Sequence, residues 1–313
     1  MKILGFGCVV WDDISEDPQA EGPQNIGGTI FNMVVHLKRL GDEASILTAI
    51  GDDPLGSITI RKMAKLGMET ELVKIVPEPT CLVKVTFDEN KNWSYSIDDR
   101  VSWDFIYVNK SDIDNINHRK YNVLCFGTME QRNMVSRKTL IKILEECRFD
   151  TIYLDLNLRS PFYSKEIIEF SLKKCTIAKM NIEEAIMTNN MMDIDAASIE
   201  EFMTSLRQIY AIDKVIVTDG ESGAYFDDRE KCGYCNGYII DLVDTVGAGD
   251  AFSAGLLHKL GEGYSLEQAC DFACRMGAII CSARSSIPGY TLSEVYKLSK
   301  RQGPRKTRPF VRL

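Results

Sequence analysis

The sequence predicts an α/β fold in which one doubly wound, mostly parallel sheet is flanked by helices and carries a small β lid. Apolar segments of strand length alternate with helical segments along most of the 313 residues. Such alternation is typical of a parallel sheet covered by helices. The alternation stops once, between residues 80 and 103, where the pattern becomes that of a hairpin. We therefore expect a single domain over residues 1–313.

The expected elements follow one another in a regular order. In the amino-terminal part they are a strand at Ile3–Val10, a helix at Phe31–Leu40, a strand at Ser45–Ile50 and a helix at Leu55–Leu66. After the interruption, strands are expected at Asn122–Phe126, Thr151–Leu156, Thr176–Met180 and Lys214–Thr218. Helices are expected between them at Ser136–Glu146, Ser164–Lys174 and Ala196–Tyr210.

The interruption itself predicts a lid. Cys81–Asp88 and Trp93–Asp98 alternate with period two around the turn Glu89–Asn92, which indicates a hairpin. A hairpin without an adjacent helix cannot bury both of its faces on the main sheet. Residues 80–103, with part of residues 10–26, are therefore expected to project as a small lid over one edge. Because an open edge strand can pair with another copy, a homodimer through the lid is also expected.

Charge and hydropathy exclude several classes of partner. The formal net charge of -8 opposes binding to a phosphate backbone, so we expect no nucleic acid partner. No stretch approaches the roughly 20 apolar residues that span a bilayer, and the start lacks a signal peptide. The sequence therefore predicts a cytoplasmic protein without a membrane partner. The basic tail at residues 300–313 is expected to be solvated, and we assign it no function.

The ten cysteines indicate a reduced core better than a metal site. Most of them are scattered singly along apolar segments. Cys232 and Cys235 form a CxxC pair, but no second pair follows at the spacing of a zinc ribbon. Cys270 and Cys274 lie in an expected helix.

The chemistry is expected at the glycine-rich segment Asp244–Gly255, which runs directly into a helix. Gly247 and Gly249 allow backbone N–H groups to converge on one point. That point is a helix N-terminus, which favours an anion such as a phosphoryl group. Asp250 stands in the same turn, where a bound phosphate would repel it, and proton acceptance would explain its presence. An ordinary glycine-rich helix start capped by aspartate is the alternative.

The same segment fits the pattern DTxGAGDxFxxG and resembles the signature of the ribokinase-like (PfkB) carbohydrate kinases. Gly27–Asn32 is similar to the GGxxxN element of that family, and Ile50–Gly56 is similar to its GxDxxG element. The resemblance covers nearly the whole chain up to about Lys300. It implies a ribokinase-like fold and an ATP-dependent sugar kinase that uses Mg²⁺. No P-loop sequence is present, so the nucleotide must be held in another way.

The resemblance also implies roles for single residues. Asp250 is similar to the catalytic base of the family, and the amides of Gly247, Ala248 and Gly249 are similar to its anion hole. The sugar site implied by the resemblance lies in the amino-terminal half and contains Asp12, Gly27, Gly28 and Asn32. From the residues alone, Asp12 as a turn residue and Asn32 as a buried cap remain alternatives.

A magnesium site is implied by Asn181–Glu184, which resembles the NxxE element of the family. In that element Asn181 and Glu184 would hold Mg²⁺ through water. The residues alone also fit acidic groups that complement a helix dipole.

Nucleotide contacts are implied for Thr218, Gly220 and Gly223, which resemble a TxGxxG turn. Cys274 stands where the family often has an asparagine beside the nucleotide base. Ser285–Ser286 replaces a common Gly-Ala pair, so the resemblance leaves open whether a monovalent cation binds there.

The substrate implied by the resemblance is D-fructose, converted to fructose 6-phosphate. Asp155–Arg159 resembles a DxNxR element of fructokinases and ketogluconate kinases, in which Arg159 would neutralise phosphate or hold a ring hydroxyl. Fructokinases also show patterns similar to Phe126–Arg132, Tyr95–Ile97 and Val101–Ile106, although Glu130 replaces a small residue. The alternatives are a 2-keto-3-deoxygluconate, ribose or nucleoside kinase, and a sugar-binding regulator without turnover.

Overall fold

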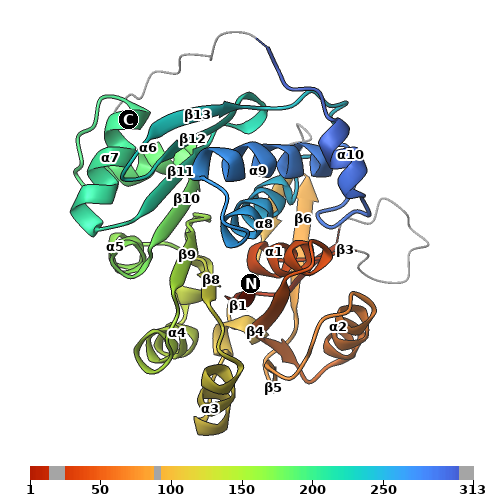
Figure 1. Ribbon diagram of the computed structural model, residues 1–313. Helices are drawn as coiled ribbons and strands as arrows, with labels where there is room; N and C mark the ends of the chain where they lie inside the picture. The colour runs from red at the N-terminus through yellow and green to blue at the C-terminus, as the bar shows by residue number, and fades with distance from the viewer. Residues whose placement is uncertain (14–24, 88–92, 303–313) are drawn as a thin grey trace.

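The computed structural model describes residues 1–13, 25–87 and 93–302 (Figure 1). The large sheet contains β1 (Lys2–Phe6), β4 (Glu43–Gly51), β5 (Val73–Val76), β8 (Val123–Phe126), β9 (Thr151–Asp155), β10 (Ile177–Asn181), β11 (Lys214–Thr218), β12 (Gly223–Asp227) and β13 (Cys232–Asn236). The second sheet contains β2 (Val10–Asp13), β3 (Asn25–Gly27), β6 (Cys81–Phe87) and β7 (Trp93–Ser96).

The large sheet is doubly wound, as expected. Its strand order is β13-β12-β11-β10-β9-β8-β1-β4-β5, and the pairs from β5 to β11 are parallel. The strands β12 and β13 add an antiparallel edge. The chain winds from β1 to β4 and β5, then crosses to β8 on the other side of β1. Ligands of such sheets bind outside the carboxyl ends of the strands at this switch point.

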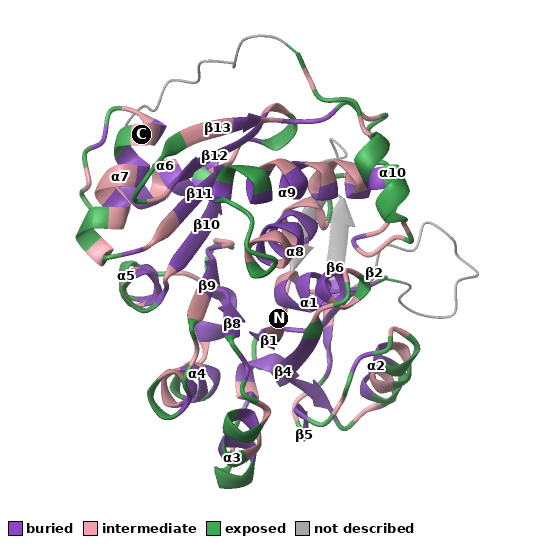
Figure 2. Ribbon diagram, viewed as in Figure 1, coloured by how far each residue is buried: buried purple, intermediate pink, exposed green. Residues whose placement is uncertain are grey.

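Helices cover both faces of the sheet. On one face lie α1 (Thr29–Arg39), α2 (Pro54–Lys65), α8 (Ala248–Gly261) and α9 (Leu266–Cys281), with α10 (Leu292–Lys297) beside α9. On the other face lie α3 (Lys110–Arg119), α4 (Met134–Glu146), α5 (Lys165–Lys174), α6 (Ile182–Met191) and α7 (Ile199–Tyr210). Ile3 packs into the core between the sheet and the helices of the first face. Leu4 and Phe6 pack into the core on the other face. Successive strand residues thus face opposite helix layers, and Figure 2 shows the central strands as mostly buried.

The expected strand at Ile3–Val10 is wrong in one respect, because the chain divides it between two sheets. β1 ends at Phe6 in the large sheet, and β2 begins at Val10 in the second sheet. At Gly7, between them, an added Cβ would lie 2.4 Å from the Cβ of Ile30 on α1. The close approach of α1 requires glycine there, and the chain leaves the large sheet at that point.

The expected hairpin is present in the second sheet. β6 and β7 are antiparallel, with Phe87 opposite Trp93, and the predicted turn lies outside the described residues. β2 pairs with β3 in the antiparallel sense and with β6 in the parallel sense. The base of β6 is tied to α2 through Asp53, whose carboxylate accepts from the amides of Gly56 and Thr80 at 2.6 and 2.7 Å.

A buried ion pair joins the end of the hairpin segment to the loop after β8. It connects two short 3₁₀ helices, Ser102–Phe105 and Met129–Arg132. The Arg132 guanidinium donates to both carboxylate oxygens of Asp104, at 2.8 and 2.7 Å. Its carbon also lies 4.1 and 4.4 Å from the ring centroids of Trp103 and Phe162. The two sequence patterns around residues 101–106 and 127–132 therefore form one packed unit.

Within the described ranges, no helix has the length and apolar character needed to cross a membrane.

We predict that Arg132→Leu lowers the free energy of unfolding by about 3–5 kcal/mol, because it leaves the buried Asp104 carboxylate without its partner. Urea unfolding followed by circular dichroism measures the loss. As a control, Lys173→Gln removes an exposed ion pair with Glu169 on α5 and should leave stability close to that of the wild type. Equal effects of the two substitutions would contradict this account of the Arg132 pair.

Candidate active site

The first turn of α8 has the geometry of an anion site. Gly247 caps this helix with φ of 82°, and an added Cβ there would lie 2.5 Å from the Cα of Ser286. Both the left-handed backbone and the lack of space require glycine at this position. The N–H groups of a first helical turn have no partner within the helix. The amide of Ala248 donates a long hydrogen bond of 3.3 Å to the carbonyl of Thr245.

Asp250 lies in the same turn and has an unusual environment. Its Oδ2 accepts a hydrogen bond of 2.7 Å from the Nδ2 of Asn32 on α1. Burial raises the pKa of Asp250 to about 7, and the charge of Asp155 acts in the same direction. The Asn32 hydrogen bond and the charges of Lys179 and Arg159 act in the opposite direction. A carboxylate with this pKa is well matched to accept a proton near neutral pH.

A chain of hydrogen bonds behind Asn32 fixes its position. The Ser286 hydroxyl donates to the Asn32 side-chain carbonyl at 3.3 Å. His36, one turn along α1, lies with Nε2 3.0 Å from the Ser286 carbonyl and with Nδ1 3.1 Å from the Tyr290 hydroxyl. Burial lowers the pKa of His36 to about 4, so its ring is neutral. The loop that packs against Gly247 is thereby joined to α1.

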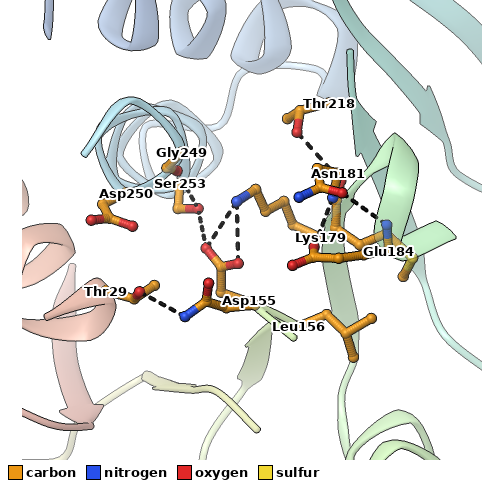
Figure 3. Close-up of polar contacts among 12 residues, drawn as sticks. Thr29, Asp155, Leu156, Lys179, Asn181, Glu184, Thr218, Gly249, Asp250 and Ser253 are labelled. Carbon is orange, nitrogen blue, oxygen red and sulfur yellow. Dashed lines mark hydrogen bonds and ion pairs between the residues drawn. The ribbon is translucent and has the colours of Figure 1, made fainter. Parts of the chain in front are cut away.

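A second network lies under the same turn of α8 (Figure 3). Asp155 and Lys179 are direct neighbours in the register of β9 and β10, and the Lys179 Nζ lies 3.1 Å from each Asp155 carboxylate oxygen. The Ser253 hydroxyl on α8 lies 2.9 Å from Asp155 Oδ2 and 2.9 Å from the Gly249 carbonyl. It accepts from the Tyr153 hydroxyl at 2.7 Å. Because a hydroxyl has one proton, the charged carboxylate is its stronger acceptor.

Asn181 and Glu184 form a reciprocal cap at the start of α6. The Asn181 side chain accepts from the Glu184 amide at 2.8 Å, and Glu184 Oε2 accepts from the Asn181 amide at 2.9 Å. The other oxygen, Oε1, accepts from the Leu158 amide at 2.9 Å. Both carboxylate oxygens are thus engaged, which suits contact with a metal through water rather than directly.

A preformed metal site is absent from the described residues, because they contain no group of three or more His, Cys, Asp or Glu side chains placed to hold an ion. Magnesium that keeps most of its waters and binds to nucleotide phosphates does not need such a group. The residues at Asn181 and Glu184 therefore fit water-mediated Mg²⁺, and this role stays a prediction.

Thr218 lies beside Asn181, since the two residues are paired at the carboxyl ends of β11 and β10. Gly220 and Gly223 follow in the turn between β11 and β12, with φ of 53° and 129°. At Gly223 an added Cβ would lie 2.0 Å from the Cys235 carbonyl oxygen. The backbone of the turn therefore explains why glycine stands at both positions, and their contacts with a nucleotide remain a prediction.

Cys274 lies inside α9 in a closed environment. Burial raises the pKa of its thiol well above the ordinary value, and the charges of Asp271 and Lys300 act on it from nearby. Lys300 forms an ion pair of 2.5 Å with Asp271, and Arg301 forms one of 2.9 Å with Glu221. The first residues of the predicted basic tail are therefore docked on the protein, whereas residues 303–313 lie outside the described part.

The amino-terminal residues of the predicted sugar site are partly assembled. An added Cβ on Gly27 would lie 3.8 Å from the side-chain amide of Asn32, so these two residues are close. Gly28 has φ of 123° and approaches the Cys8 carbonyl oxygen, 2.3 Å from an added Cβ, which requires glycine for packing. Asp12 lies on β2, and burial raises its pKa to about 6.

Glu130, which departs from the family pattern, is buried beside the loop that follows β1. Its Oε1 accepts from the Cys8 amide at 2.8 Å. Burial raises the pKa of its carboxyl group. In this structure it supports the backbone of that loop.

The sequence patterns did not identify Lys179, Ser253 and His36 as parts of the site. A lysine inside the apolar strand at Thr176–Met180 is a detectable signal, because a charge in a buried strand needs a partner. No comparable signal existed for His36, whose partners Ser286 and Tyr290 lie more than 200 residues away in sequence.

The chain as a whole is similar to several known proteins. The sequence profile described as pfkB family carbohydrate kinase matches residues 13–291. The chain is 26% identical to the fructokinase of Escherichia coli over 278 residues, which cover 83% of this chain and 87% of that protein. It is 24% identical to the aminoimidazole riboside kinase of Salmonella typhimurium over 305 residues, 92% of each chain.

A solved structure shares the fold. The structure of a fructokinase with bound ATP from Xylella fastidiosa matches with a TM-score of 0.80 at 19% identity, covering 94% of this chain and 97% of that one. The profile match extends over most of the chain and includes the glycine turn with Asp250. The chain therefore belongs to the pfkB family of carbohydrate kinases.

Proposed function

We propose that this protein transfers the γ-phosphoryl group of ATP to a primary hydroxyl of a monosaccharide, and that the sugar is D-fructose, which becomes fructose 6-phosphate. The observation that supports the transfer most directly is the placement of Asp250. It is a half-buried carboxylate with a pKa of about 7 in the first turn of a helix that begins at a glycine cap. A proton acceptor is thereby combined with an anion site.

Each part of the site has a separate task in this reaction. The sugar oxygen forms a bond to the γ-phosphorus while the bond from that phosphorus to the β,γ-bridging oxygen breaks. Asp250 takes the proton of the sugar hydroxyl, and the amides of Gly247, Ala248 and Gly249 stabilise the negative charge on the phosphoryl oxygens. Mg²⁺, when bound with the nucleotide, neutralises phosphate charge, and the cap formed by Asn181 and Glu184 fits contact with its waters.

The sugar is held, in this proposal, by residues from the second sheet, from the start of α1 and from the loop after β9. They are Asp12, Gly27, Gly28, Asn32 and Arg159. Asn32 donates to Asp250, so it would also direct the carboxylate toward the reacting hydroxyl. The second sheet is proposed to act as a lid over this site. Among the described strands its edge strand β7 pairs on one side only, and two copies would form a dimer through the other side.

Fructose is favoured over an anionic sugar acid by the charges around the lid. Arg100 is paired with Glu78 at 3.4 Å, so its charge is already compensated. A keto-acid substrate needs a cation for its carboxylate, whereas a neutral sugar does not. The similarity to named fructokinases supports the same choice, while the similarity to an aminoimidazole riboside kinase keeps a riboside among the alternatives.

We predict that Asp250→Asn lowers kcat by at least about a hundredfold, about 2.7 kcal/mol of transition-state stabilisation, because the amide cannot accept the proton. Calorimetric titration with ATP should show nearly unchanged nucleotide binding. A variant that retains most of its kcat would exclude Asp250 as the base.

The pH dependence should report the same group. Because burial raises the pKa of Asp250 to about 7, the carboxyl group is protonated below that pH and cannot act as a base. The value of kcat/KM should fall about tenfold per pH unit on the acid side of an apparent pKa near 7. The residual activity of Asp250→Asn should not show this fall in kcat/KM at acid pH. An acid limb with an apparent pKa near that of an ordinary aspartate would contradict the assignment.

Substrate preference is tested by competition at equal concentrations. Fructose should be phosphorylated with a kcat/KM at least about tenfold above that for ribose, 2-keto-3-deoxygluconate or a nucleoside, a difference of about 1.4 kcal/mol. Consumption of one of the other substrates first would exclude fructose and leave the kinase proposal standing.

A further inference from the structure

The carboxylates of Asp250, Asp155 and Glu184 act on one buried ammonium, that of Lys179, which lies beside the start of α8. Asp250 lies in the first turn, and Asp155 lies on the strand beneath it (Figure 3). The charge of Glu184 raises the pKa of Lys179, as the charges of Asp155 and Asp250 do. A phosphoryl group entering this region adds negative charge beside three carboxylates, and nearby like charges oppose it. The buried ammonium of Lys179 is therefore the group to examine.

The Lys179 ammonium reaches the anion site itself. Its Nζ lies 3.1 Å from both Asp155 oxygens, which engages two of its three N–H bonds. An added Cβ on Gly249 would lie 3.1 Å from the same nitrogen. Gly249 belongs to the turn whose amides are proposed to bind phosphate. The nitrogen thus packs against the backbone at the point where the anion would arrive, with one N–H left to donate.

The charge on Lys179 is maintained by its surroundings. Burial lowers the pKa of Lys179, but the carboxylates of Asp155, Glu184 and Asp250 outweigh burial and raise it above its ordinary value. Asp155 is itself fixed, because Ser253 contacts it and Tyr153 donates to Ser253. The lysine therefore cannot swing away from α8 without breaking a buried network.

We propose that Lys179 donates its remaining N–H to the phosphoryl group during transfer, and that Asp155 holds the ammonium in place for this contact. This inference rests on the proposed kinase function and adds a residue to it. Lys179 is then a catalytic residue, and Asp155, Ser253 and Tyr153 are positioning residues. The alternative is that Lys179 only compensates the charge of Asp155.

Paired substitutions separate these two roles. Lys179→Met alone leaves Asp155 buried without a partner and is expected to destabilise the fold. Asp155→Asn with Lys179→Met removes both charges at nearly constant volume, so a merely structural role predicts a folded and active enzyme. Our proposal predicts a folded enzyme whose kcat is at least about a hundredfold lower, with fructose affinity, measured by calorimetry, within about threefold of the wild type.

Two further variants complete the test. Lys74 and Asp112 form a buried pair of the same kind, at 2.6 Å between β5 and α3, so Lys74→Met with Asp112→Asn is a matched control. That control should keep kcat within about threefold of the wild type. Lys179→Arg retains the charge and should recover at least about tenfold in kcat over Lys179→Met, in line with a contact to phosphate.

The outcomes are distinguishable from failure of the kinase proposal. A wild type without phosphoryl transfer to any sugar contradicts the proposed function. A wild type that is active, together with a double variant at Asp155 and Lys179 that keeps kcat within about threefold, overturns the role of Lys179. If thermal unfolding shows that the double variant does not fold, Asp155→Asn with Lys179→Gln decides, because two neutral amide side chains can hydrogen-bond to each other. A kcat within about threefold of the wild type in that variant also overturns the proposal.

Discussion

A carboxylate and a helix N-terminus, which favours anions, occupy the same turn of α8, and this constraint explains much of the surrounding structure. In the proposed reaction Asp250 lies close to a phosphoryl group that repels it, and its side chain is partly buried. Its pKa of about 7 is the physical result, since burial opposes the charged form while Asn32, Lys179 and Arg159 support it. The balance keeps the group able both to accept a proton and to release it. Gly247 makes the turn possible, because no side chain fits beside Ser286.

The topology of the sheet brings the parts of this turn together. The carboxyl ends of β9, β10 and β11 carry Asp155, Asn181 and Thr218, so parallel pairing alone sets them along one edge. The helix α8 comes from the carboxyl-terminal part of the chain, and its first turn lies over this edge of the sheet (Figures 1 and 3). The switch point of the strand order lies between β1 and β8, and doubly wound sheets bind their ligands at such a point.

Several residues that fit the family motifs also have a structural reason to be there. Glu184 caps α6 and supports the Leu158 amide, and Gly28 permits the packing of α1 against Cys8. Gly223 permits the pairing of β12 with β13. Arg132 belongs to a sequence pattern that suggested fructose, and it forms a buried ion pair with Asp104. Residues of a motif in this fold can therefore be required for the local structure of the site as much as for contacts with its ligands. The substrate must be established by measurement.

The sequence by itself determined the doubly wound fold, the hairpin and the glycine turn with Asp250, because strand and helix periods and turn glycines are local properties of the chain. It identified β10 as an apolar strand but gave no role to Lys179. The division of Ile3–Val10 between two sheets is seen only in the structure, where α1 lies against the chain at Gly7. The partners of Asp250, Lys179 and His36 come from segments far apart in the chain. Burial and long-range contact set both the pKa of Asp250 and the direction of the Lys179 ammonium, and only the tertiary structure creates them.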